Sequence, residues 1–265
     1  MRVAVLQMAA VDGNIAANLR QIVRAARAAS AAEAKILVAP ELALTGYAAA
    51  AAGRVAEFAQ APGGPVHAKL TELSTELGIS FILGFPERDG TTFFNSAIAV
   101  TPDRGPAIYR KCHLYGDLER KSFCAGSAVS PIVTVEGFRV GMLICYDVEF
   151  PEWVRVLALE GVDLIAVPTA LPRSDANRRV ARSMIPARAL ENGVFIAYAD
   201  LCGEDGLYRY QGMSAIVGPN GEDLARGGVE SCLLIADLDK SRYSAGGGDP
   251  YLKDRRSGLY ERLLR

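Results

Sequence analysis

Cys145 is the residue around which chemistry could be organised. It directly follows residues 138–144, a mostly apolar run of strand length that predicts a buried strand. Pro151 then opens an apolar helix. A thiol held at the end of a buried strand, with free backbone amides just beyond it, is arranged as a nucleophile, and the N–H of Tyr146 can face an oxyanion. The alternative is a buried core cysteine, which position alone does not exclude.

A carboxylate occupies a similar place earlier in the chain. Residues 36–39 predict a short strand, and Pro40, Glu41 and Leu42 follow it. Loops that follow buried strands commonly form pockets, so Glu41 is a candidate for chemistry there. Taken alone, Glu41 is better explained as a residue that caps or solvates the loop.

The elements that must position these residues alternate along the chain. Helical patterns and apolar strands occur in both halves, and hairpin turns at residues 88–90 and 219–221 join several strands. This mixture predicts a layered α/β domain, with either one mixed sheet or two sheets packed face to face with helices outside. No GxGxxG motif follows the first strand, which argues against a dinucleotide-binding fold.

Composition narrows the class of protein. Half of the 265 residues are hydrophobic and the net charge is −1, so neither nucleic acid nor a membrane surface is an expected partner. Five cysteines without CxxC spacing suit a reducing, cytoplasmic compartment, and no export signal or membrane-spanning stretch is found. Only two histidines are present, and no metal site is expected. Of these, His67 is expected on an exposed helical turn.

No linker or repeat divides the chain, so residues 1–265 are expected to form a single domain. From Ser241 the sequence is polar and rich in glycine. Residues 241–265 therefore read as a C-terminal tail, which either contacts a neighbouring subunit or frays.

Four segments together resemble the carbon–nitrogen hydrolase (nitrilase) superfamily. They are residues 40–42 (Pro-Glu-Leu), 109–114 (Tyr-Arg-Lys-Cys-His-Leu), 145–147 (Cys-Tyr-Asp) and 187–192 (Ala-Arg-Ala-Leu-Glu-Asn), in that family's order. The resemblance implies a four-layer αββα sandwich, usually dimerised, with a Glu-Lys-Cys catalytic set and no cofactor. A homodimer or larger homo-oligomer is therefore expected.

The resemblance also implies roles for individual residues. Glu41 would be the general base, Lys111 would stabilise the oxyanion, and Cys145 would form a thioester with the acyl group. Glu119 would support the lysine and the substrate amide from a loop. His113 is expected to pack the lysine loop, and Asp147 and Glu149 are expected to fix the turn after the cysteine.

The residues after Cys145 bear on the substrate. Glu149 stands where related carbamoylases carry basic residues, and Tyr146 stands where true nitrilases commonly have Trp. The expected reaction is hydrolysis of a small aliphatic or amino-acid-type carboxamide, with nitrile or N-carbamoyl substrates as alternatives. A catalytically idle scaffold remains open as a different class, whereas a papain-like protease lacks its local cysteine signature. The candidate substrate-binding residues, chosen because they follow strands, are Tyr47, Tyr115, Tyr146 and Thr169.

Overall fold

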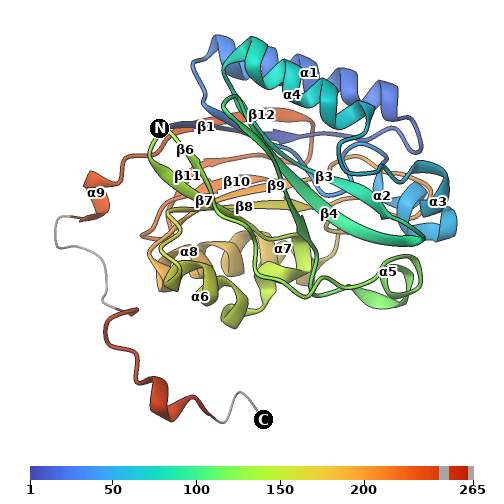
Figure 1. Cartoon of the computed structure of the whole chain (residues 1–265). Coiled ribbons are helices and arrows are strands. Elements are labelled where there is room, and N and C mark those ends of the chain that lie inside the picture. The colour runs from blue at the N-terminus through green and yellow to red at the C-terminus, as the bar shows by residue number, and fades with distance from the viewer. Residues whose placement is uncertain (245–250, 262–265) are drawn as a thin grey trace.

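Two six-stranded sheets lie face to face between layers of helices (Figure 1). The structure is a computed structural model and describes residues 1–244 and 251–261. The remaining parts of the expected tail, residues 245–250 and 262–265, lie outside the described residues. The expected four-layer αββα sandwich is confirmed, and of the two arrangements predicted, paired sheets are the correct one.

Each sheet combines parallel strands at its centre with antiparallel strands at its edges. Listed in spatial order, the first sheet contains β12 (Cys232–Asp237), β1 (Arg2–Gln7), β2 (Ile36–Val38), β3 (Ser80–Asp89), β4 (Thr92–Thr101) and β5 (Arg104–Arg110). The second contains β11 (Asp223–Arg226), β10 (Ala215–Val217), β9 (Phe195–Asp200), β8 (Leu164–Thr169), β7 (Phe138–Met142) and β6 (Val133–Val135).

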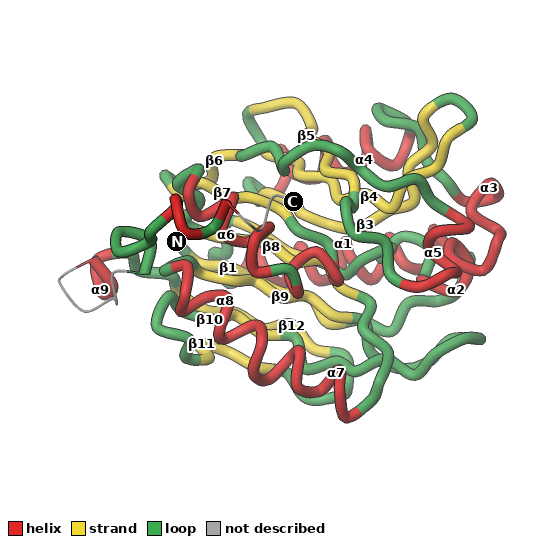
Figure 2. The backbone as a smooth tube through the Cα atoms, turned by 90° about the horizontal axis from the view of Figure 1, so that it is seen from below, coloured by secondary structure: helices red, strands yellow, loops and turns green. Residues whose placement is uncertain are grey.

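Helices cover the outer face of each sheet (Figures 1 and 2). On the first sheet lie α1 (Ile15–Ala31) and α4 (Pro65–Leu77), and on the second lie α6 (Pro151–Leu159) and α8 (Ile185–Asn192). The short helices are α2 (Tyr47–Ala49), α3 (Val55–Phe58), α5 (Gly116–Ser122), α7 (Asp175–Arg179) and α9 (Ser241–Ser244). Single turns of other helix types are η1 (Ala50–Arg54), η2 (Cys145–Glu149), η3 (Val180–Met184) and η4 (Ser257–Leu259).

The helix boundaries follow from local sequence chemistry. The Asn14 side chain accepts a hydrogen bond from the N–H of Ala17 and caps α1. Proline occupies the first turn of α4, α6 and α8, where its missing N–H costs no helical hydrogen bond. Gly78 ends α4 and Gly193 ends α8, both in the left-handed conformation that glycine adopts without strain.

The central core is the apolar interior between the two sheets. Val5 and Val38 of the first sheet pack in one cluster with Val140 and Ala166 of the second, and all four are fully buried. Parallel pairing directs the ends of β7 and β8 in the second sheet to the same side of this core. The N–H of Glu41, just past β2, donates to the carbonyl of Thr169 at the end of β8 at 3.3 Å, which joins the two sheets at that side.

Candidate active site

Three strand ends from both sheets deliver the reactive residues. Glu41 follows β2, Lys111 directly follows β5, and Cys145 follows β7 in the opposite sheet. Cys145 has a φ of +46°, in the left-handed region that non-glycine residues rarely adopt. The sharp turn expected after its strand is therefore present, and it is held in a strained conformation of the kind that collects at functional sites.

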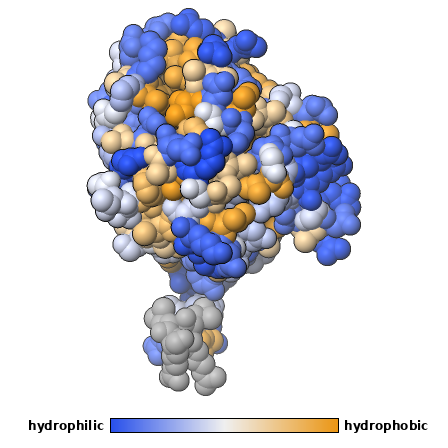
Figure 3. Space-filling view, turned by 90° about the vertical axis from the view of Figure 1, so that its right-hand side faces the viewer, coloured by the Kyte–Doolittle hydropathy of each residue, from blue (hydrophilic) through white to orange (hydrophobic). Residues whose placement is uncertain are grey.

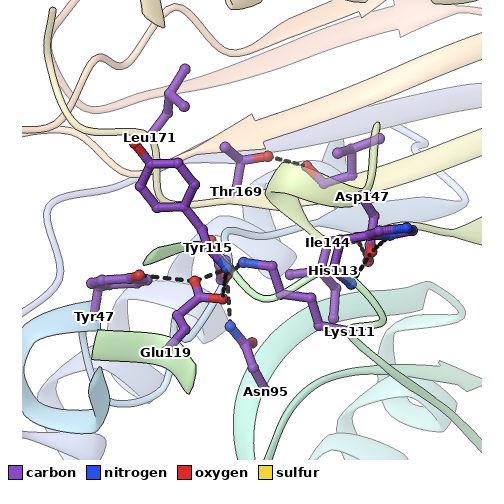
Figure 4. Close-up of polar contacts among 12 residues, drawn as sticks. Tyr47, Asn95, Lys111, His113, Tyr115, Glu119, Ile144, Asp147, Thr169 and Leu171 are labelled. Atoms are coloured by element: carbon purple, nitrogen blue, oxygen red, sulfur yellow. Dashed lines mark hydrogen bonds and ion pairs between the residues drawn. The ribbon is translucent and has the colours of Figure 1, made fainter. Parts of the chain in front are cut away.

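Lys111 lies between the carboxylates of Glu41 and Glu119, and Figure 4 shows it beside Glu119. Its Nζ is 2.7 Å from Oε1 of Glu41 and 2.7 Å from Oε1 of Glu119, and all three side chains are at most 1% exposed. Asn95 of β4 donates to the same Glu41 oxygen at 2.7 Å. An ammonium group has three donors, so these two pairs leave Lys111 one further N–H.

Glu119 is fixed by three donors. Besides Lys111, the hydroxyl of Tyr47 donates to its Oε1 at 2.8 Å, and the backbone N–H of Tyr115 donates to its Oε2 at 2.8 Å. Glu119 lies on helix α5, not on the loop expected from the sequence. With both oxygens engaged, this carboxylate holds the lysine in place and has little capacity to act as a base.

Glu41 has one engaged oxygen and one free oxygen. Its Oε2 is buried and has no hydrogen-bond partner among the described residues. Burial raises the pKa of Glu41 above its ordinary value, against the opposing charge of Lys111. A carboxylate with a free oxygen and a raised pKa is a better proton acceptor near neutral pH than a solvated one.

The protonation states of the other two residues follow from the same surroundings. Burial alone would lower the pKa of Lys111, but the charges of Glu119 and Glu41 outweigh it and raise that pKa well above its ordinary value. Burial and the charge of Glu41 raise the pKa of Cys145. The resting site therefore contains an ammonium group and a neutral thiol, whose proton must be removed for attack.

A network of hydrogen bonds braces the turn that carries Cys145. Asp147 accepts from the N–H of Ile144 at 3.2 Å, from the hydroxyl of Tyr109 at 2.8 Å and from the N–H of His113 at 2.9 Å. The Nδ1 of His113 also lies 2.8 Å from Asp147, and its ring stacks on Phe150 with 4.0 Å between centroids. The structural roles expected of His113 and Asp147 agree with this geometry.

Glu149 does not share that structural role. Residues Cys145–Glu149 form a single 3₁₀ turn, in which side chains three apart lie on the same side. Tyr146 and Glu149 therefore face the same way and both line a cavity beside Cys145, whereas Asp147 points towards His113. The sequence expectation that Glu149 fixes the turn was wrong.

The cavity beside Cys145 has a volume of about 320 Å³. A larger surface hollow of about 760 Å³ lies elsewhere, and none of the reactive residues lines it. Of the expected substrate-binding residues, Tyr47, Tyr115 and Tyr146 line the cavity, but Thr169 does not, because its hydroxyl turns back to the carbonyl of Val167. The lining also includes residues that sequence reasoning did not single out, namely Ala170, Leu171, Pro172, Ala176, Asn177, Val180, Met184 and Tyr208.

Within residues 1–244 and 251–261, no cluster of three or more His, Cys, Asp or Glu side chains is arranged to hold a metal ion. No helix in these ranges is long and apolar enough to span a bilayer.

The fold and this site together define a class: an αββα-sandwich hydrolase with a cysteine nucleophile. The sequence profile of the carbon–nitrogen hydrolase family matches residues 2–246, and the chain belongs to that family. A "Hydrolase in pqqF 5'region" of Pseudomonas protegens is 37% identical over 99% of this chain and 92% of its own length. An (R)-stereoselective amidase of Pseudomonas sp is 34% identical over 97% of this chain and 92% of its own.

Solved structures agree with these relatives. The NitN amidase of Nesterenkonia sp. AN1 is 34% identical, covers 100% of both chains and superposes with a TM-score of 0.86. The E41Q variant of that amidase has been solved with acrylamide added at its active site cysteine. The chain is thus an enzyme of the carbon–nitrogen hydrolase family, to which these amidases also belong.

Proposed function

We propose that the protein hydrolyses a small carboxamide to a carboxylic acid and ammonia through a thioester on Cys145. The observation that carries this proposal is the buried pair of Lys111 and Glu41, 2.7 Å apart, whose charges act on Cys145, and Cys145 lines a small cavity. The acrylamide adduct on the active site cysteine of the Nesterenkonia amidase supports it by likeness.

Each residue then has one task. The free oxygen of Glu41 accepts the thiol proton while the sulfur of Cys145 attacks the amide carbon. The free N–H of Lys111 and the backbone N–H of Tyr146 stabilise the tetrahedral oxyanion. Protonated Glu41 gives its proton to the departing ammonia, then accepts one from the water that cleaves the thioester. The acid leaves as Cys145 regains its proton.

The cavity lining favours an amide over the alternatives. Among its described residues, none carries a positive charge that could pair with the carboxylate of an N-carbamoyl amino acid. Its size suits a short acyl group. Nitrile hydrolysis remains the second candidate, because the same nucleophile and base can attack a nitrile carbon.

Ammonia release decides between these substrates. We expect butyramide and propionamide to be hydrolysed in preference to butyronitrile and to N-carbamoyl-β-alanine, and Cys145→Ala to abolish turnover. A preference for the nitrile or the carbamoyl compound would overturn the assignment. An absence of turnover with every substrate, together with equal alkylation rates for Cys145 and the exposed Cys124, would favour the idle scaffold.

We also propose that the chain works as a cytoplasmic homo-oligomer built from one domain, with residues 241–265 as a tail used in subunit contacts. All five cysteines are free, which suits a reducing compartment. A fluorescent fusion expressed in the native cell would test the compartment. Light scattering would test the assembly by measuring its mass in solution, and the mass of a single chain would refute it.

A further inference from the structure

One carboxylate in the cavity, that of Glu149, has no partner among the described residues. Glu149 lines the cavity with Cys145, and its side chain makes no hydrogen bond or ion pair to any described residue. By contrast, Glu119, the other carboxylate of the lining, has three donors. Burial raises the pKa of Glu149 and outweighs the opposing charges of Lys111 and Arg188, as expected for a carboxylate that is partly removed from water.

The two cations near Glu149, Lys111 and Arg188, both have other carboxylate partners. Lys111 pairs with Glu41 and Glu119. Arg188 donates to the backbone carbonyls of Val148 and Glu149 at 3.0 and 2.8 Å, and to the carboxylate of Glu191 at 3.0 Å. These contacts hold the Glu149 backbone but leave its side chain facing the cavity.

The rest of the lining suits a cation. Four tyrosines face this space, and Tyr115 packs edge-on against Tyr146 with 5.2 Å between ring centroids. Tyr47 and Tyr208 form a second pair at 6.0 Å. Aromatic faces attract ammonium groups, and no lysine or arginine is among the described residues that line the cavity.

We propose that Glu149 is a specificity residue that binds an ammonium group on the acyl part of the substrate, so that the preferred substrates are amides that also carry an amine. This inference rests on the proposed amide hydrolysis. It narrows the substrate class from small carboxamides in general to aminoacyl amides, and it makes substrates with a free carboxylate unfavourable.

The test compares substrates that differ in charge rather than in size. Ammonia release is measured as kcat/KM for β-alaninamide (cationic), butyramide (neutral) and succinamate (anionic). Glycinamide and 5-aminopentanamide vary the distance between ammonium and amide. For the wild type we expect kcat/KM for the best aminoamide to exceed that for butyramide by about tenfold or more, as for a hydrogen bond to a charged group.

Glu149→Gln should remove that preference, chiefly by raising KM for the aminoamide, and Glu149→Lys should shift preference towards succinamate. The ratio of aminoamide to butyramide in the same preparation corrects for any general loss of activity. Glu152→Gln is the matched control, since Glu152 is an exposed carboxylate of the same segment that does not line this cavity. The ratio of kcat/KM for the aminoamide to kcat/KM for butyramide should be the same in Glu152→Gln as in the wild type.

Two results would overturn the inference, and they are distinguishable. If the wild type hydrolyses neutral amides with no charge preference, or if Glu149→Gln keeps the preference, the proposed function stands and the role of Glu149 is refuted. If no amide releases ammonia, the proposed function fails and the inference fails with it.

Discussion

Glu41 has oxygens in two different surroundings, and this asymmetry makes its role testable. Oε1 accepts from Lys111 and Asn95, whereas Oε2 is free to take a proton. Glu41→Gln keeps the side chain's size but removes the basic oxygen. We expect kcat for amide hydrolysis to fall about 100- to 10,000-fold, the usual contribution of a general base.

Steady-state ammonia release at saturating amide measures this effect. Glu57→Gln, which removes an exposed carboxylate that does not line the cavity, should leave kcat unchanged. Thermal melting of both variants separates catalysis from folding. Near-normal turnover by Glu41→Gln in a folded protein would identify some other group as the base.

Asp200 offers a pH-dependent prediction. It is fully buried, its Oδ1 accepts the N–H of Leu171 at 2.8 Å, and its Oδ2 has no partner among the described residues. Burial raises the pKa of Asp200 well above its ordinary value. The folded protein therefore retains a proton that the unfolded chain releases above about pH 4, so this residue makes stability fall as pH rises.

Asp200→Asn keeps the acceptor for Leu171 and removes the ionisation. We expect the free energy of unfolding of the variant, relative to wild type, to increase as pH rises from about 4 towards 8. Urea unfolding across this range provides the measurement, and Asp103→Asn, at an exposed carboxylate, should show no such trend. A difference that stays constant with pH would contradict the argument.

At the residue scale, the sequence predicts the reactive groups better than it predicts their partners. Glu41 and Cys145 follow predicted strands, and Lys111 lies in one of the segments that resemble the family. Asn95 was missed because it lies inside a strand, where a polar residue carries no signal of its contacts. His67 was expected to be exposed, but it is 1% exposed and packs edge-on against Phe85, a contact made only by the tertiary fold.

Gly84 shows how one element positions another. It lies in β3, and its N–H donates to the carbonyl of Pro40 at 3.0 Å. A Cβ at this position would lie 2.4 Å from the N of Leu42 and 2.5 Å from the Cα of Glu41. Only glycine allows β3 to pass this close beneath the segment that carries the base.

Gly84→Ala should therefore displace Glu41 and destabilise the fold by about 1–3 kcal/mol, the usual cost of overpacking. The melting temperature of the protein and its kcat for amide hydrolysis should both fall. Gly105→Ala is the matched control, since a Cβ there meets nothing within 4 Å. A Gly84→Ala protein with normal activity and melting temperature would show that the Glu41 segment is not constrained by β3.

At the element scale, helix boundaries could be predicted from the sequence where a proline or a glycine marks them. Pro151 lies in the first turn of α6, which confirms the predicted helix start, and Gly78 ends α4. Pro186 lies in the first turn of α8, directly after the π-helical turn Val180–Met184, where a proline costs no helical hydrogen bond. The choice between one mixed sheet and two facing sheets could not be made, because strand pairing between distant segments leaves no local pattern.

At the scale of the whole molecule, apolar side chains are unevenly distributed. The face seen in Figure 3 is a mosaic of hydrophilic and hydrophobic patches. Helices α6 and α8 contact each other on the outer face of the second sheet (Figure 2). Leu159 of α6 is 52% exposed and Leu190 of α8 is 39% exposed. Residues 255–261 of the tail and α6 together border a hollow of about 650 Å³. Large exposed apolar side chains of this kind mark interaction surfaces.

We therefore expect this helical face to join two copies of the chain, with a mass in solution of at least twice the chain mass of 28.3 kDa. Glu residues at Leu159 and Leu190 would place four like charges in a two-fold symmetric contact, because each subunit contributes both sites. Multi-angle light scattering of the double variant Leu159→Glu, Leu190→Glu should thus show a monomer at concentrations where the wild type is assembled. Val11→Glu removes an equally exposed apolar side chain outside these helices and should not change the mass. A monomeric wild type would refute the assembly, and an oligomeric double variant would place the contact on another face.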